Sequence, residues 1–397
     1  MLFSISLILL LGLLAGQVTS RLGLPALVAY LLLGMILGPH GLHLLDENLL
    51  ALSGDLRRIA LVVILLKAGL TLSFSDFRSV GRQALLLSFL PASFEILGYG
   101  LLAPLFFPVS HTEALLLGAV IAAVSPAVVV PRMARFIEEG LGTAKKIPQL
   151  VLAGASCDDI FVIVLFTSLL HILKGGAFHG QDLLSIPGSI LSGILVGGLV
   201  GLLLAKVLGR LSSSLHFFLL FGTGLLLLGV EDLISELVPL SGLLAIMASS
   251  MVLRQKTPSS IHGPLSQQFG RLWIGAEVFL FVLVGAAVDL PYTLHAGAGA
   301  LLLILLCLLF RSLGVLLSTS GLPVTRRERL FFIVAYLPKA TVQAAIGGIA
   351  LSEGLSCGVL VLSVAVVSIL FTAPLGSLLI DVFGPPLLAS AHKKSHA

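Results

Sequence analysis

Two adjacent carboxylates, Asp158 and Asp159, lie near the middle of an apolar stretch, residues 148–172, that is long enough to cross a lipid bilayer. A carboxylate at that depth costs about 3 kcal/mol on scales derived from membrane insertion, so two in succession require a reason. A buried structural ion pair would need only one acid and one base. Embedded acids of this kind mark ion sites or proton relays, and the pair therefore predicts such a site.

The composition of the chain excludes a soluble globular protein. Of the 397 residues, 57% are hydrophobic and only 11% are charged, and the mean hydropathy is +1.13. At about 20 residues for each crossing, a chain of this length holds roughly a dozen membrane helices with short connections. The sequence therefore predicts an all-α polytopic membrane protein, in which residues 1–397 form one integral membrane unit without a soluble domain.

About thirteen apolar spans can be marked along the chain, counting about 20 residues for a crossing. They cover roughly residues 1–19, 25–40, 58–74, 84–107, 113–134, 148–172, 185–208, 216–231, 239–253, 270–290, 297–318, 328–351 and 356–384. The span at about 185–208 is a linker helix between a first repeat, about 1–172, and a second repeat, about 216–384. Equal halves around an odd linker helix make the two halves inverted repeats. The first span has no basic start and is read as a retained helix rather than a secretory signal.

The basic residues are distributed unevenly over the connections between these spans. Alternate connections collect most of them, whereas the connections on the opposite side hold only Arg57, Arg58 and Lys174. Because cytoplasmic loops are enriched in lysine and arginine, this asymmetry predicts an N-terminus outside the membrane and a C-terminus in the cytoplasm.

Several charged residues remain inside the spans. Unpaired charges at that depth are expensive, so pairing among them is the expectation. Lys67 could instead extend its charged end toward the interface, and Glu277 could be the polar end of a tilted helix, so both are open to a purely structural role. The residues in question are Lys67, Glu95, Asp158, Asp159, Glu277, Arg311 and Lys339.

Two spans carry prolines that should interrupt them. SPAVVVP at 125–131 lies in the fifth span, and LPKATVQ at 337–343 lies in the twelfth. Proline removes a backbone donor and clashes with the preceding turn, so each helix should kink or unwind. An ordinary proline kink, common in membrane helices, is the alternative. The two interruptions occupy the fifth span of each half, and interrupted spans in matching positions point to a transporter's substrate site.

Interrupted helices expose backbone groups with partial charges of about half an elementary unit near the middle of the membrane. Lys339 stands at one interruption and can neutralise the negative ends of half-helices. Ser125, Thr341 and freed carbonyl groups supply oxygen ligands of the kind that a small hard cation takes. Asp158 and Asp159 would supply the negative charge. Adjacent residues on a helix point about 100° apart, so one acid can face the site while the other faces a partner.

At these residues the chain resembles the sodium/proton antiporters of the monovalent cation:proton antiporter-2 family, and among them the NHA-type branch. The matching stretches follow the family order over nearly the whole chain. They are LLKAGLTL near 66–72, GAVIAAVSPAVVVPRM at 118–133, LAGASCDDI at 152–160, LPKATVQAAIG at 337–347 and TAPLGSLLI at 372–380.

The resemblance implies an NhaA-like fold: a homodimer of about 13-helix subunits, each with a dimerisation domain and a mobile core that holds two crossed, broken helices. Asp159 would be the ion carrier, with Asp158 beside it. Many electrogenic relatives have a lysine at the position of Arg311. The NHA-type branch, like this sequence, has an arginine there, and Glu95 is the matching intramembrane acid. The partner of Arg311, Glu95 or Asp158, stays open at this point.

The sequence is therefore interpreted as an electroneutral exchanger of Na⁺ or Li⁺ for H⁺ in a bacterial inner membrane. A guanidinium stays charged throughout, which leaves Asp159 to trade a proton for a cation. If Arg311 paired only with Glu95, Asp158 would be free to carry a second proton. The expected partners are the transported ions, the lipid bilayer and a second copy of the chain, without a cofactor or nucleic acid.

Four other functions remain as alternatives. A K⁺/H⁺ antiporter or another ion transporter could use the same fold, with electrogenic exchange. A channel would need a continuous polar lining, whereas these charges cluster in a few spans. An intramembrane aspartyl protease needs two carboxylates face to face, and neighbours on one helix are poorly placed for that. A purely structural membrane protein would not account for so many charges at depth.

Overall fold

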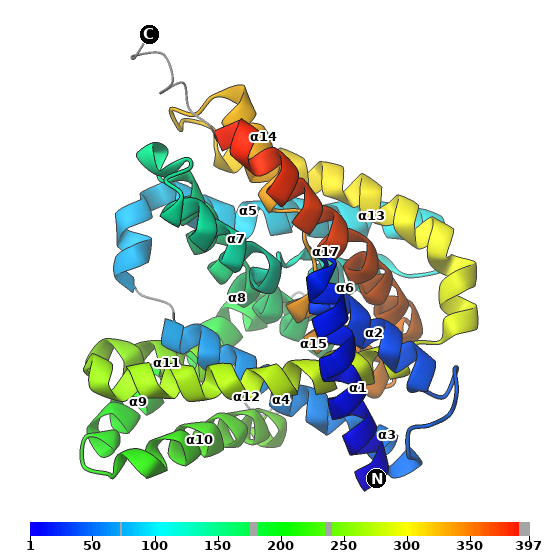
Figure 1. Cartoon of the computed structure of the whole chain (residues 1–397), viewed down its shortest axis with the longest axis horizontal. Coiled ribbons are helices and arrows are strands. Elements are labelled where there is room, and N and C mark those ends of the chain that lie inside the picture. The colour runs from blue at the N-terminus through cyan, green and yellow to red at the C-terminus, as the bar shows by residue number, and fades with distance from the viewer. Residues whose placement is uncertain (72–73, 175–181, 235–239, 389–397) are drawn as a thin grey trace.

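The computed structural model describes residues 1–71, 74–174, 182–234 and 240–388, and within them the side chains of all but 74–81, 156, 157, 160, 182–187, 189 and 190. The described part is all-helical, apart from turns and short connections (Figure 1). The helices are α1 (Leu2–Arg21), α2 (Ala26–Leu37), α3 (Glu47–Ala51), α4 (Ser53–Thr71), α5 (Phe74–Phe106), α6 (His111–Ala122), α7 (Pro126–Glu138), α8 (Ile147–Lys174), α9 (Asp182–Leu208), α10 (Ser213–Ile234), α11 (Gly242–Lys256), α12 (Ser259–Ala286), α13 (Leu290–Ser318), α14 (Arg326–Ala335), α15 (Thr341–Gly347), α16 (Ile349–Ser352) and α17 (Gly358–Leu388).

Each predicted span falls on one of these helices or on a broken helix. Within the described residues, 8 helical stretches are long and apolar enough to cross a membrane, with the broken pair α6 and α7 counted as one. The described part of the chain is thus all-helical with several membrane spans, while the count of thirteen crossings stays a prediction. Helices also occupy parts of two stretches between the marked spans. A short helix, α3, lies between the second and third spans, and α12 begins at Ser259, ahead of the tenth span.

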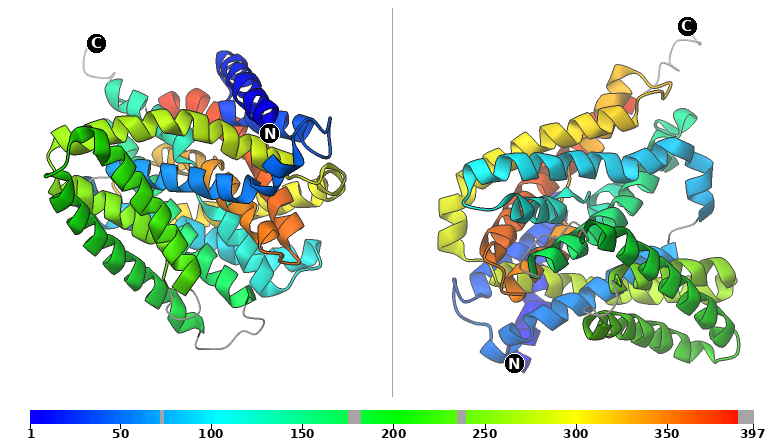
Figure 2. Two further views of the ribbon diagram at one scale, coloured as in Figure 1. Left: turned by 90° about the horizontal axis from the view of Figure 1, so that it is seen from below. Right: turned by 180° about the vertical axis from the view of Figure 1, so that it is seen from behind.

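The helices pack in two groups. We call α1–α4 and α9–α12 the unbroken group, and α5–α8 and α13–α17 the broken-helix group, because the latter contains both interrupted helices. In Figure 1, α9–α12 lie in the lower half and α5, α7, α13 and α14 in the upper half. Figure 2, seen from behind, shows α5 and α13 running side by side across the broken-helix group.

A stripe of glycines holds part of the unbroken group together. Gly193, Gly197 and Gly201 recur at four-residue spacing on α9 and face backbone carbonyl groups of α11. A methyl group at any of the three would come within 3.0 Å of a carbonyl oxygen, closer than real Cβ atoms approach. Small residues at this spacing let membrane helices pack backbone to backbone. The contact between α9 and α11 therefore depends on the absence of side chains.

Both predicted interruptions are confirmed. The first broken helix stops at Ala122 as α6 and resumes at Pro126 as α7, and the second stops at Ala335 as α14 and resumes at Thr341 as α15. The first break covers 123–125 and so ends at Ser125, the first residue of the quoted stretch 125–131, while α7 continues through Pro131. Proline is tolerated as the first residue of a helix, where its missing N–H has no partner to lose.

Candidate functional site

The two breaks touch each other in the middle of the broken-helix group. The backbone N–H of Ser125, in the first break, donates to the carbonyl oxygen of Pro338, in the second, over 2.8 Å. Each break thus supplies a partner for a backbone group that the other leaves without a helical one. The polar side chains of the site gather around this crossing.

Arg311, on α13, forms ion pairs with both Glu95 and Asp158, the two acids that the sequence left open as its partner. Its Nη1 donates to Glu95 Oε2 over 2.6 Å and its Nη2 to Asp158 Oδ2 over 3.0 Å. Its Nε donates to the carbonyl oxygen of Tyr336 over 2.7 Å, and Nη1 also donates to the carbonyl of Ala122. The guanidinium is 1% exposed. Both acids left open as the partner of Arg311 therefore form ion pairs with it.

Lys339 lies in the second break and faces the end of α6. Its ammonium donates to Glu95 Oε2 over 2.6 Å and to the carbonyl oxygen of Ala122 over 3.1 Å. Its backbone N–H is held by the hydroxyl of Thr372 on α17, at 3.0 Å. A cation is favourable at the negative carboxyl end of a helix. Lys339 thus lies at the carboxyl end of α6, one of the half-helix ends.

Gln343, on α15, is a polar group of the site to which the sequence analysis assigned no role. Its amide Nε2 donates to the carbonyl oxygens of Ile121 and Ala123 over 2.9 and 2.7 Å, and its Oε1 accepts from the N–H of Ala340 at 2.8 Å. It therefore satisfies the end of α6 and the start of α15 together. An amide in an otherwise apolar span was the signal that could have identified it.

Asp158 and Asp159 have opposite surroundings although they are neighbours on α8. Asp158 is fully buried, and its Oδ2 accepts from the N–H of Val124 at 2.8 Å as well as from Arg311. Asp159 has a buried Oδ1 without a hydrogen-bond partner, and within the described residues no base lies within ion-pair distance of it. Asp158 thus belongs to a network of charges, whereas Asp159 lies outside it.

Asp159 lines a small cavity between α4, α8, α11 and α15. The cavity has a volume of about 20 Å³, enough for about one water-sized particle. Thr341, at the start of α15, is the other polar side chain that lines it, and the remaining walls are largely apolar. Carboxylate and hydroxyl oxygens are the ligand types that small hard cations accept.

The predicted ligands therefore separate into three places. Asp159 and Thr341 face one cavity, and Asp158 belongs to the network of Arg311. Ser125 is fully buried at the first break, its Oγ has no hydrogen-bond partner, and it does not line the cavity. Of the four residues, the structure brings two together.

The expectation that all charges inside the spans pair with each other was wrong for Lys67 and Glu277 as well as for Asp159. Among the described side chains, neither Lys67 nor Glu277 has an opposite charge within 4.0 Å. The Lys67 ammonium lies 6.0 Å from the centre of the Trp273 ring, a cation–π contact. Glu277 lines a separate cavity of about 410 Å³ together with Arg132 and Asp381. Water in that cavity can solvate its carboxylate without an ion pair.

Comparison with known proteins assigns the chain to a family. Residues 5–383 match the model of the transmembrane sodium/hydrogen exchanger family. Human sodium/hydrogen exchanger 9B2 is 31% identical over 381 residues, which is 92% of this chain and 70% of that protein. Human sodium/hydrogen exchanger 9B1 is 31% identical over 359 residues, covering 86% and 68%.

The fold is also that of a solved antiporter. The structure of the sodium proton antiporter MjNhaP1 from Methanocaldococcus jannaschii at pH 8 superposes with a TM-score of 0.83 and 22% identity, and the match covers 97% of each chain. The matched relatives are transporters of sodium ions and protons rather than enzymes. The chain, an integral membrane protein, belongs to the sodium/hydrogen exchanger family.

Proposed function

We propose that this chain exchanges Na⁺ or Li⁺ for H⁺ by alternating access, with Asp159 as the group that both ions use in turn. One observation carries this assignment. Asp159 is the intramembrane acid that lines a water-sized cavity without an ion-pair partner among the described residues. Glu95 and Asp158 are neutralised by Arg311 and Lys339. Thr341 contributes a second oxygen ligand, and Ser125 would contribute a third only after the site rearranges.

Competition for one carboxylate makes the exchange obligatory. A proton or a cation cancels the charge of Asp159, whereas the empty anionic site is costly to move through an apolar barrier. The site therefore crosses when it is loaded with one ion or the other. No separate gating device is needed for the coupling.

The charge network favours an exchange of one proton for each cation. Asp158 is held by Arg311 and by the N–H of Val124, so it is not free to act as a second carrier. Arg311 remains charged under all physiological conditions. Among the described acids at the helix crossing, Asp159 is then the group that trades a proton for a cation, and one-for-one exchange moves no net charge. This stoichiometry can be tested by imposing a membrane potential without any other driving force; voltage-driven Na⁺ uptake would contradict it.

The orientation, assembly and branch of the chain are part of the same proposal. The turn between α11 and α12 lies at the left of Figure 1, and the α2–α3 and α12–α13 connections lie at the right. Arg254 and Lys256, in the last turn of α11, adjoin the first of these connections, so the left side would be cytoplasmic, with the N-terminus outside. We propose a homodimer of the NHA-type branch in a plasma membrane, the bacterial inner membrane being the expectation from the sequence.

Reconstitution tests the proposal directly. Purified protein in liposomes with a trapped pH-sensitive dye should respond to added Na⁺ or Li⁺, and K⁺ added in parallel distinguishes the K⁺/H⁺ alternative. Asp159→Asn keeps the size of the side chain but removes its charge, so it should abolish cation-dependent proton movement. Its elution on size exclusion and its melting temperature serve as the folding control. Asp159→Asn vesicles that still exchange at the wild-type rate would refute the role of Asp159.

A further inference from the structure

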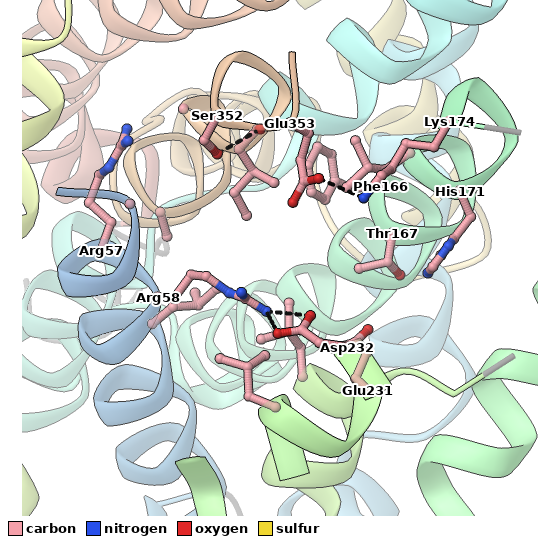
Figure 3. Close-up of a pocket in the computed structure, with 18 residues that line it drawn as sticks. Arg57, Arg58, Phe166, Thr167, His171, Lys174, Glu231, Asp232, Ser352 and Glu353 are labelled. Carbon is pink, nitrogen blue, oxygen red and sulfur yellow. Dashed lines mark hydrogen bonds and ion pairs between the residues drawn. The ribbon is translucent and has the colours of Figure 1, made fainter. Parts of the chain in front are cut away.

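A larger cavity lies at the end of the seam between the two helix groups. It has a volume of about 350 Å³ and is bounded by α4 and α10 of the unbroken group and by α8 and the α15–α16 segment of the broken-helix group (Figure 3). Figure 3 shows Arg58 and Asp232 on one side of it, and Lys174 and Glu353 on the other. In the proposed orientation this is the outer end of the molecule.

Four of the charged residues that line this cavity form ion pairs within their own helix group, while Arg57 and Glu231, also in its lining, have no ion-pair partner among the described side chains. Arg58 Nη2 contacts both carboxylate oxygens of Asp232 at 2.7 and 2.8 Å, joining α4 to α10. Lys174 Nζ contacts Glu353 Oε2 at 2.6 Å, joining the end of α8 to the residue that follows α16. Among the described residues, no ion pair across this cavity ties one group to the other. The two groups can therefore shift relative to each other without breaking either pair.

Two apolar side chains separate this cavity from the one that holds Asp159. Leu61 on α4 and Ala345 on α15 line both cavities, and they are 2% and 3% exposed. One belongs to the unbroken group and the other to the broken-helix group. The boundary between the two cavities therefore lies in the seam, where a relative shift of the groups would open it.

We infer that the cavity of Figure 3 is a vestibule for hydrated monovalent cations, and that Leu61 and Ala345 form the barrier between this vestibule and Asp159. This inference rests on the proposed function, because it gives the vestibule the same cargo. A dry apolar layer blocks a cation since the ion would have to leave its water shell without gaining ligands. The two ion pairs, together with Arg57 and Glu231, keep the walls of the vestibule polar.

Silver ion is a suitable probe, because it is a small monovalent cation that reacts with thiols. Leu65 lies one helical turn after Leu61 and lines the Asp159 cavity but not the vestibule. A Leu65→Cys variant would be exposed to Ag⁺ from one face of oriented, chloride-free membrane vesicles. The rate is read as the loss of thiol available to a fluorescent maleimide after unfolding, with the wild-type chain as background for its native cysteines.

We expect Leu65→Cys to react slowly, and the Leu61→Ala/Leu65→Cys variant to react at least tenfold faster from the outer face. Val62→Ala/Leu65→Cys is the matched control, since Val62 is buried on the same helix but lines neither cavity. Leu61→Val offers a milder opening, with an intermediate rate, if Leu61→Ala does not fold.

Three results would contradict the assignment of Leu61 and Ala345 as the barrier. They are an unchanged rate with Leu61→Ala, an equal acceleration with Val62→Ala, and an acceleration only from the opposite face. This readout does not require transport. A wild-type chain that fails to exchange ions therefore contradicts the proposed function, whereas a failed silver experiment on an active exchanger contradicts the vestibule alone.

Discussion

Between α9 and α11 the contact is made by backbone against backbone, whereas between α6, α13 and α15 it is made by charges and amides. In the first region, Gly197 and its neighbours remove side chains so that two helices approach closely. In the second, Arg311 and Gln343 reach into the gap that a broken helix leaves. A continuous helix satisfies its own backbone and needs only shape, but an interrupted one must find polar partners elsewhere.

The difference predicts where single substitutions do the most damage. Losses in the broken-helix group come from leaving buried charges or carbonyl groups unsatisfied, and losses in the unbroken group come from crowding. Three substitutions separate the two cases, in order of decreasing effect.

Arg311→Gln should have the largest effect. It leaves Glu95 with Lys339 but leaves Asp158 without a base within ion-pair distance, and breaking a buried pair costs about 3–5 kcal/mol. The melting temperature in detergent should fall sharply. Adding Asp158→Asn should recover more of the loss than adding Glu95→Gln does, because Glu95 retains a partner. Strictly additive losses in both double variants would show that these side chains do not interact as the structure has them.

Gln343→Leu should have an intermediate effect. The substitution keeps a similar volume but strips the carbonyl oxygens of Ile121 and Ala123 of their donor, at about 1–3 kcal/mol for each unsatisfied group. We expect a lower melting temperature and faster amide hydrogen exchange at the end of α6. Gln343→Glu is an informative companion, because it retains an acceptor for Ala340 but has no amide donor. Unchanged protection of α6 in both variants would argue against this capping role.

Gly197→Ala should have the smallest effect of the three and should be confined to packing. An added methyl group would meet the carbonyl oxygen of Ala245, and overpacking of this kind costs about 1–3 kcal/mol. Gly198→Ala, one residue further on α9, is the control, since its Cβ would meet nothing within 4 Å. That variant should melt at or slightly above the wild-type temperature, because alanine is the better helix former. Equal melting temperatures for the two variants would mean that α9 and α11 are not in close contact.

The sequence was most informative where polar residues contrast with an apolar background. Asp158, Lys339 and Arg311 are conspicuous inside apolar spans, and prolines marked both interruptions to within a few residues. It could not choose between Glu95 and Asp158 as the partner of Arg311, because spacing along a helix gives a direction but not a distance between helices. The answer, that both are partners, depends on how α13 packs against α5 and α8.

Other features depend on packing that no local pattern encodes. Glu277 was grouped with the charges expected to pair, yet it faces a cavity that only the assembled helices create. The hydroxyl group of Ser125 and its position at a break predict a ligand, but Ser125 does not line the Asp159 cavity. Gln343 was present in the quoted motif but had no assigned role, since its carbonyl partners lie 222 and 220 residues away.

Those sequence separations have a consequence for the synthesis and membrane insertion of the protein. The carbonyl groups at the end of α6 enter the membrane long before Gln343 and Lys339 are made, and Asp158 precedes Arg311 by 153 residues. At about 5–20 residues per second, synthesis of the missing partners takes roughly ten seconds or more. During that interval, the half-made chain must hold its acids and open helix ends in water or against the insertion machinery. Completion of the core is thus a late event, and a ribosome that stalls before α13 leaves a fragment marked by unpaired charge.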